Sequence, residues 1–222
     1  MQAADDPQRR PLPADLARIL HDVRGPLNSL TMHLEVLKRT ARGDAAAEES
    51  LRTALAQLAR LADMLPAAFA VTALELGSLR RLDLGALATR VRDAEGAADV
   101  TITPGGWPSV VGDETLLGLA LTHLLRNALE ATAAGDHAPV LSGATSGDTA
   151  LVQVRDWGPG LRTTNPRLLF RLLQPTKPGH RGVGLITVER IVRLHGGELR
   201  FESAGAGATV TLALPALTSD RS

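Results

Sequence analysis

The chain has 222 residues, 44% of them hydrophobic and 22% charged, and its 24 basic and 24 acidic side chains give a formal net charge of zero. This composition is typical of a globular protein with enough chain for one compact domain or two small ones. The balanced charge and the scarcity of aromatic residues argue against a nucleic-acid partner, and the lack of cysteine excludes disulfides and thiol catalysis.

No stretch of the sequence resembles a membrane span or a signal peptide. The longest apolar run, LLGLALTHLL at 116–125, is shorter than the roughly 18 residues that cross a bilayer. Residues 1–13 mix acids, arginines and prolines without an apolar centre, so we expect an N-terminal tail there. We therefore expect no membrane span and a cytoplasmic location.

Two segments carry apolar residues at alternating spacings of four and three, the pattern of a coiled-coil seam. The first seam comprises Leu16, Leu20, Val23, Leu27, Leu30, Leu34 and Leu37, and the second comprises Leu51, Leu55, Leu58, Ala62, Leu65, Phe69, Thr72 and Leu76. A polar turn separates them, so we expect an all-α helical hairpin over residues 14–76. Because one thin seam per helix buries little surface, we expect a homodimer in which two hairpins form a four-helix bundle. The alternative is a hairpin packed on its own C-terminal domain.

The pattern changes after the second seam. We expect a linker at residues 77–81, an α+β sandwich over residues 82–216 and a C-terminal tail at 217–222. The predicted elements are helices over 82–95, 112–135 and 181–197, a strand over 99–106, two strands around a Ser-Gly-Asp turn, and a closing antiparallel hairpin.

The first candidate site is the stretch HDVRGPL, which lies in the first predicted helix. His21 follows a seam leucine, so it faces solvent, and an imidazole with a pKa near 6.5 is available as a nucleophile at neutral pH. The adjacent Asp22 can accept the proton of the other ring nitrogen, and Pro26 is expected to bend the helix. The alternative is an ordinary surface histidine beside a helix kink.

The second candidate site is HLLRNALEAT on the long predicted helix. Asn127 offers a carboxamide oxygen of the kind that suits Mg²⁺, with Arg126 and Glu130 close to it. The alternative is an asparagine that forms hydrogen bonds only within its helix.

The third and fourth candidates are rich in glycine. In DWGPGL, Asp156 ends a predicted strand and could accept an exocyclic amine, while Gly158 and Gly160 allow a ligand to approach the backbone. In PTKPGHRGVGL, glycines precede a helix whose N-terminus favours phosphate, and Lys177 adds a positive charge. Taken alone, the third segment could be a plain turn and the fourth a flexible loop.

In their order and spacing, the four motifs together resemble the sensor histidine kinases of two-component systems. HDVRGPL is similar to their phosphoacceptor box, LLRNALEA to the N box, DWGPG to the first glycine box and TKPGHRGVGL to the lid and second glycine box. The resemblance covers residues 14–215, and the form of the last motif together with NALEA is most similar to the nitrogen-regulator-like subgroup.

The resemblance implies a dimerisation and histidine phosphotransfer domain at 14–76 and a catalytic ATP-binding domain at 82–216. The latter would have the Bergerat (GHKL-like) fold, which gyrase, Hsp90 and MutL share. It implies ATP and Mg²⁺ as cofactors, with Asp156 on the adenine amine, Asn127 on the metal, and Lys177 near the phosphates. The further nucleotide-binding positions are His123, Arg126, Glu130, Gly158, Gly160, Gly182, Val183, Gly184, Leu185 and Thr209.

The reaction that the resemblance implies is autophosphorylation at Nε2 of His21, with Asp22 orienting the imidazole. The phosphoryl group would then pass to an aspartate on the receiver domain of a response regulator. Because only about a dozen residues precede the first helix, we expect that a sensory partner acts in trans, that the chain is a fragment, or that activity is constitutive.

Three departures from the family pattern qualify this hypothesis. His123 stands where the family often has Asn and where gyrase-type ATPases have a Glu that activates water, which favours phosphotransfer over hydrolysis. The segment before the lid keeps only one aromatic residue, Phe170. Gly25 stands where many members have Thr or Asn to position a hydrolytic water, which predicts weak phosphatase activity. Two alternatives remain: a phosphotransfer scaffold with a weakened ATP domain, and a GHKL-type ATPase switch.

Overall fold

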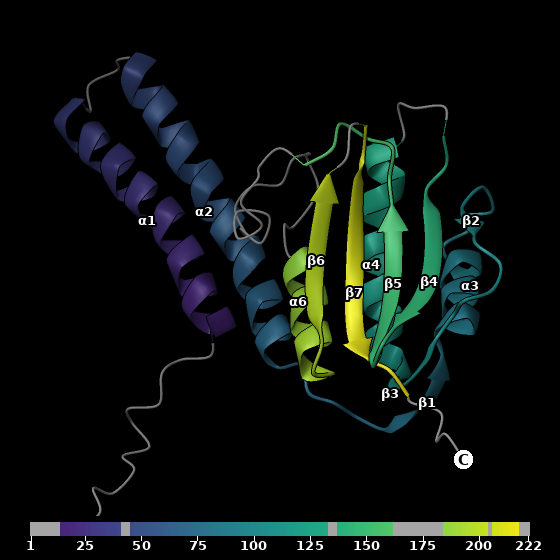
Figure 1. The fold of residues 1–222 in the computed structure, drawn as a ribbon. Helices are drawn as coiled ribbons and strands as arrows, with labels where there is room; N and C mark the ends of the chain where they lie inside the picture. Colours follow the sequence, from purple (N-terminus) through teal and green to yellow (C-terminus); the bar gives the residue numbers. More distant parts are fainter. Residues whose placement is uncertain (1–13, 41–44, 133–136, 162–183, 204–205, 218–222) are drawn as a thin grey trace, which may run out of the picture. The chain divides into compact units, whose positions relative to one another are not determined.

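The computed structural model describes residues 14–40, 45–132, 137–161, 184–203 and 206–217. These residues divide into two compact units, with the boundary between Ala73 and Leu74. Each unit is described by itself (Figure 1). None of the helices in the described parts has the combination of length and apolarity that crossing a membrane requires.

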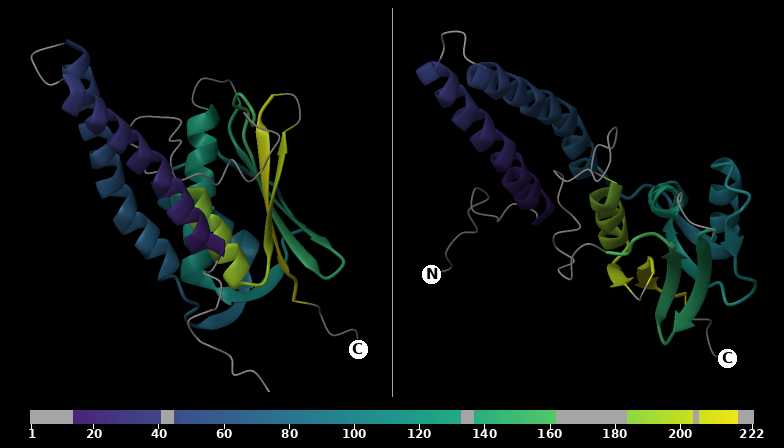
Figure 2. Two further views of the ribbon diagram at one scale, coloured as in Figure 1. Left: turned by 90° about the vertical axis from the view of Figure 1, so that its left-hand side faces the viewer. Right: turned by 90° about the horizontal axis from the view of Figure 1, so that it is seen from above.

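The first unit contains two long helices that pack against each other, α1 (Ala14–Thr40) and α2 (Ala45–Thr72) (Figures 1 and 2). Both predicted helices are thus confirmed, although α2 ends before the last residue of the expected seam, Leu76. Helix α1 continues through Pro26, which is buried. Ala47, Ala54 and Leu61 recur every seven residues on α2 and are buried, so they form one apolar stripe of the helix.

The second unit is built on a five-stranded sheet. Its order is β2 (Thr101–Ile102), β4 (Val140–Ser146), β5 (Thr149–Arg155), β7 (Ala208–Pro215) and β6 (Glu198–Ser203). A two-stranded antiparallel sheet of β1 (Leu79–Asp83) and β3 (Ser109–Asp113) accompanies it. All pairs in the larger sheet are antiparallel except β2 with β4, which is parallel.

Three helices, α3 (Leu84–Ala94), α4 (Glu114–Thr132) and α6 (Gly184–Leu194), cover one face of the larger sheet (Figure 2). Alternate strand residues such as Val152, Val154 and Leu212 point toward the helices and are almost fully buried. Leu121 and Leu125 of α4 belong to the same core cluster. The expected arrangement of helices on a sheet is therefore confirmed.

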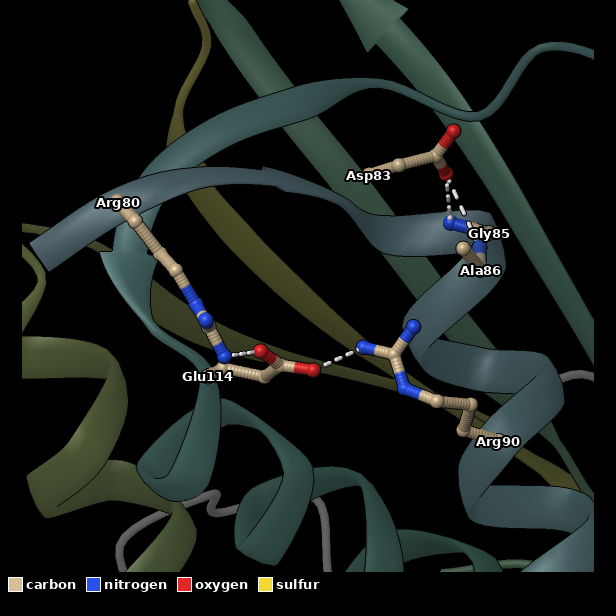
Figure 3. A network of polar contacts seen from close by, with 6 residues as sticks. All are labelled: Arg80, Asp83, Gly85, Ala86, Arg90 and Glu114. Carbon is tan, nitrogen blue, oxygen red and sulfur yellow. Dashed lines mark hydrogen bonds and ion pairs between the residues drawn. The ribbon is translucent and has the colours of Figure 1, made fainter.

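Several predicted boundaries were wrong. The expected helix over 82–95 begins at Leu84, because residues 79–83 form β1 and the Asp83 carboxylate caps α3 by accepting the N–H groups of Gly85 and Ala86 at 2.8 and 3.0 Å (Figure 3). The helix expected from residue 112 begins at Glu114, because β3 occupies 109–113. The strand expected over 99–106 contains only Thr101 and Ile102. It ends before two glycines with positive φ, residues 105 and 106.

Polar contacts join the smaller sheet to the helices. Glu114, the first residue of α4, forms ion pairs with Arg80 of β1 and Arg90 of α3 (Figure 3). Trp107 lies against Gly85 of α3 and Gly143 of β4, where a Cβ atom on either glycine would come within 2.7 Å of the indole. Its indole N–H donates to the Thr103 carbonyl at 2.8 Å. The ion pairs of Glu114 join the start of α4 to β1 and α3, and Trp107 packs between α3 and β4.

Candidate active site

Helix α4 presents four of the predicted site residues. Leu124, Leu125 and Ala128 face the core, whereas Arg126 and Asn127 are exposed and His123 is half-buried. Among the described residues, none forms a hydrogen bond with the Asn127 carboxamide. The helix therefore holds an oxygen donor of the kind that Mg²⁺ prefers on its solvent-facing side.

Burial disfavours the charged form of His123. It lowers the pKa of His123 below the ordinary value, and the nearby Arg126 guanidinium lowers it further, while Glu95 acts in the opposite direction. Arg126 forms a bidentate contact with Glu95, which follows α3, at 2.6 and 2.9 Å. This contact raises the pKa of Arg126 above the usual arginine value. The guanidinium that Glu95 holds beside His123 is compatible with a phosphate neighbour, and His123 supplies no carboxylate base.

Asp156 lies directly after β5 with its carboxylate held by the backbone. Oδ1 accepts the N–H of Gly158 at 2.9 Å and the N–H of Ala208 at 3.1 Å. The Asp156 N–H donates to the Ala208 carbonyl at 2.9 Å, which extends the pairing of β5 with β7 by one residue. No described residue forms a hydrogen bond with Oδ2. One carboxylate oxygen is therefore fixed, and the other remains available to an amine donor.

The two glycines of the DWGPG turn allow the turn to pack closely against neighbouring segments. A Cβ atom on Gly158 would lie 2.6 Å from the Ala131 carbonyl oxygen of α4. Gly160 has a φ of +74°, and a Cβ atom there would lie 2.8 Å from Ser203 Oγ. Gly158 thus lets the turn approach α4 closely, one helical turn beyond Asn127.

Helix α6 begins beside α4. A Cβ atom on Gly184 would lie 3.5 Å from His123 Nδ1, so the first residue of α6 is close to the first predicted position on α4. Leu185 packs against the core as a half-buried residue. The end of β5 and the start of α6 therefore both lie against α4, and α6 directs its N-terminal N–H groups and positive dipole end to this region.

Thr209 has a different position from the other predicted residues of this unit. It pairs with Arg155 in the register of β5 and β7. Successive strand residues point to opposite faces, so Thr209 shares a face with Arg155, whereas Ala208 is the residue of β7 that binds Asp156.

Other predicted residues lie wholly or partly outside the described residues. Lys177, Gly182 and Val183 are not described, and His21 is described only as part of helix α1. Asp22, beside His21, is buried. Within the described part of the chain, no group of three or more His, Cys, Asp and Glu side chains could hold a metal ion.

Sequence reasoning missed three residues that hold the site together. Gly207 has a φ of +94°, and a Cβ atom there would lie 2.0 Å from the Asp156 carbonyl oxygen. Thr132, the last residue of α4, accepts the Trp157 N–H at 3.4 Å and donates to the Ala128 carbonyl at 2.7 Å. Trp157 lies within the motif DWGPGL, but its residue type alone does not indicate the contacts that it makes. Gly207 begins the sequence GATVTLALP, which was expected to form the last strand, whereas β7 begins at Ala208.

Comparison with known proteins agrees with this arrangement. Residues 112–218 match the model of the family described as histidine kinase-, DNA gyrase B-, and HSP90-like ATPase. This stretch of the chain is therefore similar to the ATPase domains of that family. The matched range contains α4, the Asp156 turn and the start of α6, so the geometry described above lies within the part of the chain that is similar to this family.

Relatives extend the similarity to the helical unit. The chain is 27% identical to the sensor-like histidine kinase SenX3 of Mycobacterium bovis, over 91% of this chain and 53% of that protein. It is 29% identical to the adaptive-response sensory kinase SasA of Parasynechococcus marenigrum, over 90% of this chain and 56% of that protein. The chain thus spans about half the length of these relatives.

Solved structures support the fold. The crystal structure of full-length ShkA in complex with AMPPNP matches 93% of this chain and 46% of its own, with a TM-score of 0.59 and 24% identity. The nucleotide analogue named there is a ligand of that protein.

Proposed function

We propose that this chain is an ATP-dependent protein histidine kinase that phosphorylates its own His21 and passes the phosphoryl group to a response regulator. The observation that carries the proposal is the orientation of Asp156, whose Oδ1 is held by two backbone N–H groups beside α4. The matched ATPase domain and the names of the relatives, sensor histidine kinases, support the same function.

In the proposed nucleotide site, Asp156 Oδ2 accepts a hydrogen bond from the exocyclic amine of adenine. The N-terminus of α6, with Gly184 beside His123, favours the phosphates, and Lys177, Gly182 and Val183 would add to that contact. Asn127 would ligate Mg²⁺, which supplies charge neutralisation on the phosphate oxygens. The exposed carboxamide of Asn127 and the available oxygen of Asp156 fit these roles.

In the proposed transfer step, Nε2 of neutral His21 attacks the γ-phosphorus of ATP. The bond from that phosphorus to the bridging oxygen breaks, ADP leaves and a phosphorus–nitrogen bond forms. Asp22 accepts a hydrogen bond from Nδ1–H, which keeps the lone pair on Nε2 and stabilises the imidazolium. An aspartate oxygen of the receiver domain then displaces the imidazole. Positioning and charge neutralisation supply most of the acceleration.

We further propose that the first unit forms a homodimeric four-helix bundle. Five leucines of the predicted seams have 45–56% of their surface exposed within one chain: Leu27, Leu34, Leu51, Leu55 and Leu58. Because these leucines continue the heptad pattern while Ala47, Ala54 and Leu61 are buried, each helix has apolar surface beyond that covered within the chain. A second copy of the same hairpin would cover it with matching leucines.

Several finer predictions stay proposals of the same kind. They are membership of the nitrogen-regulator-like subgroup, a cytoplasmic location, a sensory partner in trans, the domain boundaries at residues 76 and 82, and weak phosphatase activity. Gly25 supports the last of these, since it is an exposed position one turn after His21 with no side chain to hold a water.

A single experiment separates the kinase from its competitors. The protein and its His21→Ala variant are incubated with Mg²⁺ and ATP labelled in the γ-phosphate. Label that is acid-labile, alkali-stable and lost in the variant supports the kinase. Release of free phosphate that persists in the variant supports an ATPase switch, and failure to bind nucleotide supports a scaffold with a weakened ATP domain.

A further inference from the structure

Trp157 follows Asp156 directly, and its contacts differ from those of an ordinary turn residue. Its indole N–H donates to the Ala138 carbonyl at 3.1 Å, and its backbone N–H donates to Thr132 Oγ1 at 3.4 Å. Thr132 ends α4, and Ala138 lies just before β4. One residue thus joins the turn to the last residue of α4 and to the segment that enters the sheet.

The ring of Trp157 is also held on its face. The Arg155 guanidinium carbon lies 4.0 Å from a Trp157 ring centroid, within the range of a cation–π contact. The His137 ring is tilted against the indole, with 5.3 Å between ring centroids. Arg155 is the last residue of β5, so the residues on both sides of Asp156 in sequence contact each other.

These contacts hold the residue that follows Asp156, while the N–H groups of Gly158 and Ala208 bind the Asp156 carboxylate directly. If the indole is removed, the bonds from Gly158 and Ala208 to Oδ1 remain. The turn that contains Asp156 and Gly158, however, loses its hydrogen bond to Ala138 and its packing against Arg155. The carboxylate then has more freedom to tilt, and an amine donor meets Oδ2 in its productive orientation less often.

We infer that Trp157 is a positioning residue for base recognition, which holds the Asp156 carboxylate in the orientation that reads the exocyclic amine of adenine. The inference rests on the proposed nucleotide site and goes beyond it, because it assigns to Trp157 a part of the selectivity for adenine. A purely structural role would weaken the binding of every nucleoside triphosphate equally. A positioning role weakens the binding of those with the amine more than of those without it.

The chain contains a matched control, because Trp107 is its only other tryptophan. Trp107 is also half-buried, and its indole N–H donates to a backbone carbonyl, that of Thr103, at 2.8 Å. It lies against Gly85 and Gly143, and it makes none of the contacts that hold Asp156 or Trp157. Trp107→Phe and Trp157→Phe therefore remove the same kind of hydrogen bond from two different places.

The test is calorimetric titration of the full chain with ATP and with inosine triphosphate, which carries an oxygen in place of the amine, both in the presence of Mg²⁺. We expect Trp157→Phe to weaken ATP binding about fivefold, the equivalent of one neutral hydrogen bond, and to change inosine triphosphate binding much less. The ratio of the dissociation constant for inosine triphosphate to that for ATP, which measures the preference for ATP, should therefore fall. Trp107→Phe should leave both affinities and their ratio at the wild-type values.

A second variant, Thr132→Val, leaves the indole in place but removes the acceptor of the Trp157 backbone N–H, together with the bond from Thr132 to the Ala128 carbonyl. It should lower the ratio in the same direction by a smaller factor. Wild-type ratios in both Trp157→Phe and Thr132→Val would overturn the inference, as would an equal loss in Trp107→Phe. A wild-type protein that binds neither nucleotide would overturn the proposed function itself and the inference with it.

Discussion

Replacing Gly207 by alanine tests whether the Asp156 turn depends on close contact with the start of β7. Gly207 has a φ of +94°, and its missing Cβ would lie 2.0 Å from the Asp156 carbonyl oxygen and 3.0 Å from the Trp157 Cα. A left-handed backbone with a side chain costs about 1–2 kcal/mol, and overpacking against fixed backbone costs about 1–3 kcal/mol more. We expect Gly207→Ala to lower the free energy of unfolding by about 2–5 kcal/mol.

Gly147→Ala is the matched control, because Gly147 also has a positive φ, +58°, but has nothing within 4 Å of the position of a Cβ. The free energy of unfolding of Gly147→Ala should fall only by the cost of a side chain on a left-handed backbone, about 1–2 kcal/mol. Urea unfolding at pH 7 measures both, and calorimetry measures ATP affinity, which should fall more than tenfold in Gly207→Ala and stay unchanged in Gly147→Ala. Equal stability losses in the two variants, with wild-type ATP affinity in Gly207→Ala, would refute the reasoning.

Three further predictions concern residues outside the Asp156 turn. Asp113 accepts the Leu116 N–H at 3.1 Å and the Gly77 N–H at 2.8 Å, so Asp113→Ala should lower the free energy of unfolding by about 2 kcal/mol at pH 7. Chiefly because of the bond from Leu116, the folded-state pKa of Asp113 lies below its unfolded value, so the difference in urea midpoint should shrink as the pH falls below about 4. A difference that does not shrink as the pH is lowered contradicts this. Burial lowers the pKa of His123 relative to the unfolded chain, so protonation of the unfolded chain should reduce the free energy of unfolding of the wild type below about pH 6.5. His123→Asn should not show this loss. Identical pH profiles of urea unfolding for the two proteins would contradict the prediction. Gly25→Thr, but not Gly25→Ala, should accelerate dephosphorylation of a phosphorylated cognate regulator severalfold, and rapid dephosphorylation by the wild type would show the prediction to be wrong.

The sequence predicted the parts of the site that depend on local patterns. The period of α4 placed His123 and Asn127 one turn apart. The glycines after Asp156 indicated a close approach to the backbone: the approach of a ligand there stays a prediction, and the structure shows Gly158 against Ala131 of α4. Both follow from residue types within a few positions of one another.

The missed parts depend on pairing between distant segments. Ala208 binds Asp156 through its backbone, so its side chain gave no signal, and its role follows from the register of β5 with β7. Strands β1 and β3 pair across about thirty residues of chain, and each is too short for its apolar alternation to stand out. The heptad pattern of α1 and α2 was clear in the sequence. Which of the apolar residues are buried within the chain and which stay exposed became visible only in the structure.

The central claim is that the ATP site built around Asp156 delivers a phosphoryl group to His21. The most direct measurement is the initial rate of acid-labile label incorporation from γ-labelled ATP into the wild type, Asp156→Asn, His21→Ala and His33→Ala. His33 lies on the same helix and serves as the control for the loss of a histidine. We predict wild-type labelling in His33→Ala, none in His21→Ala and a large reduction in Asp156→Asn. Acid-labile labelling that persists in His21→Ala, or a wild-type rate in Asp156→Asn, would contradict the claim.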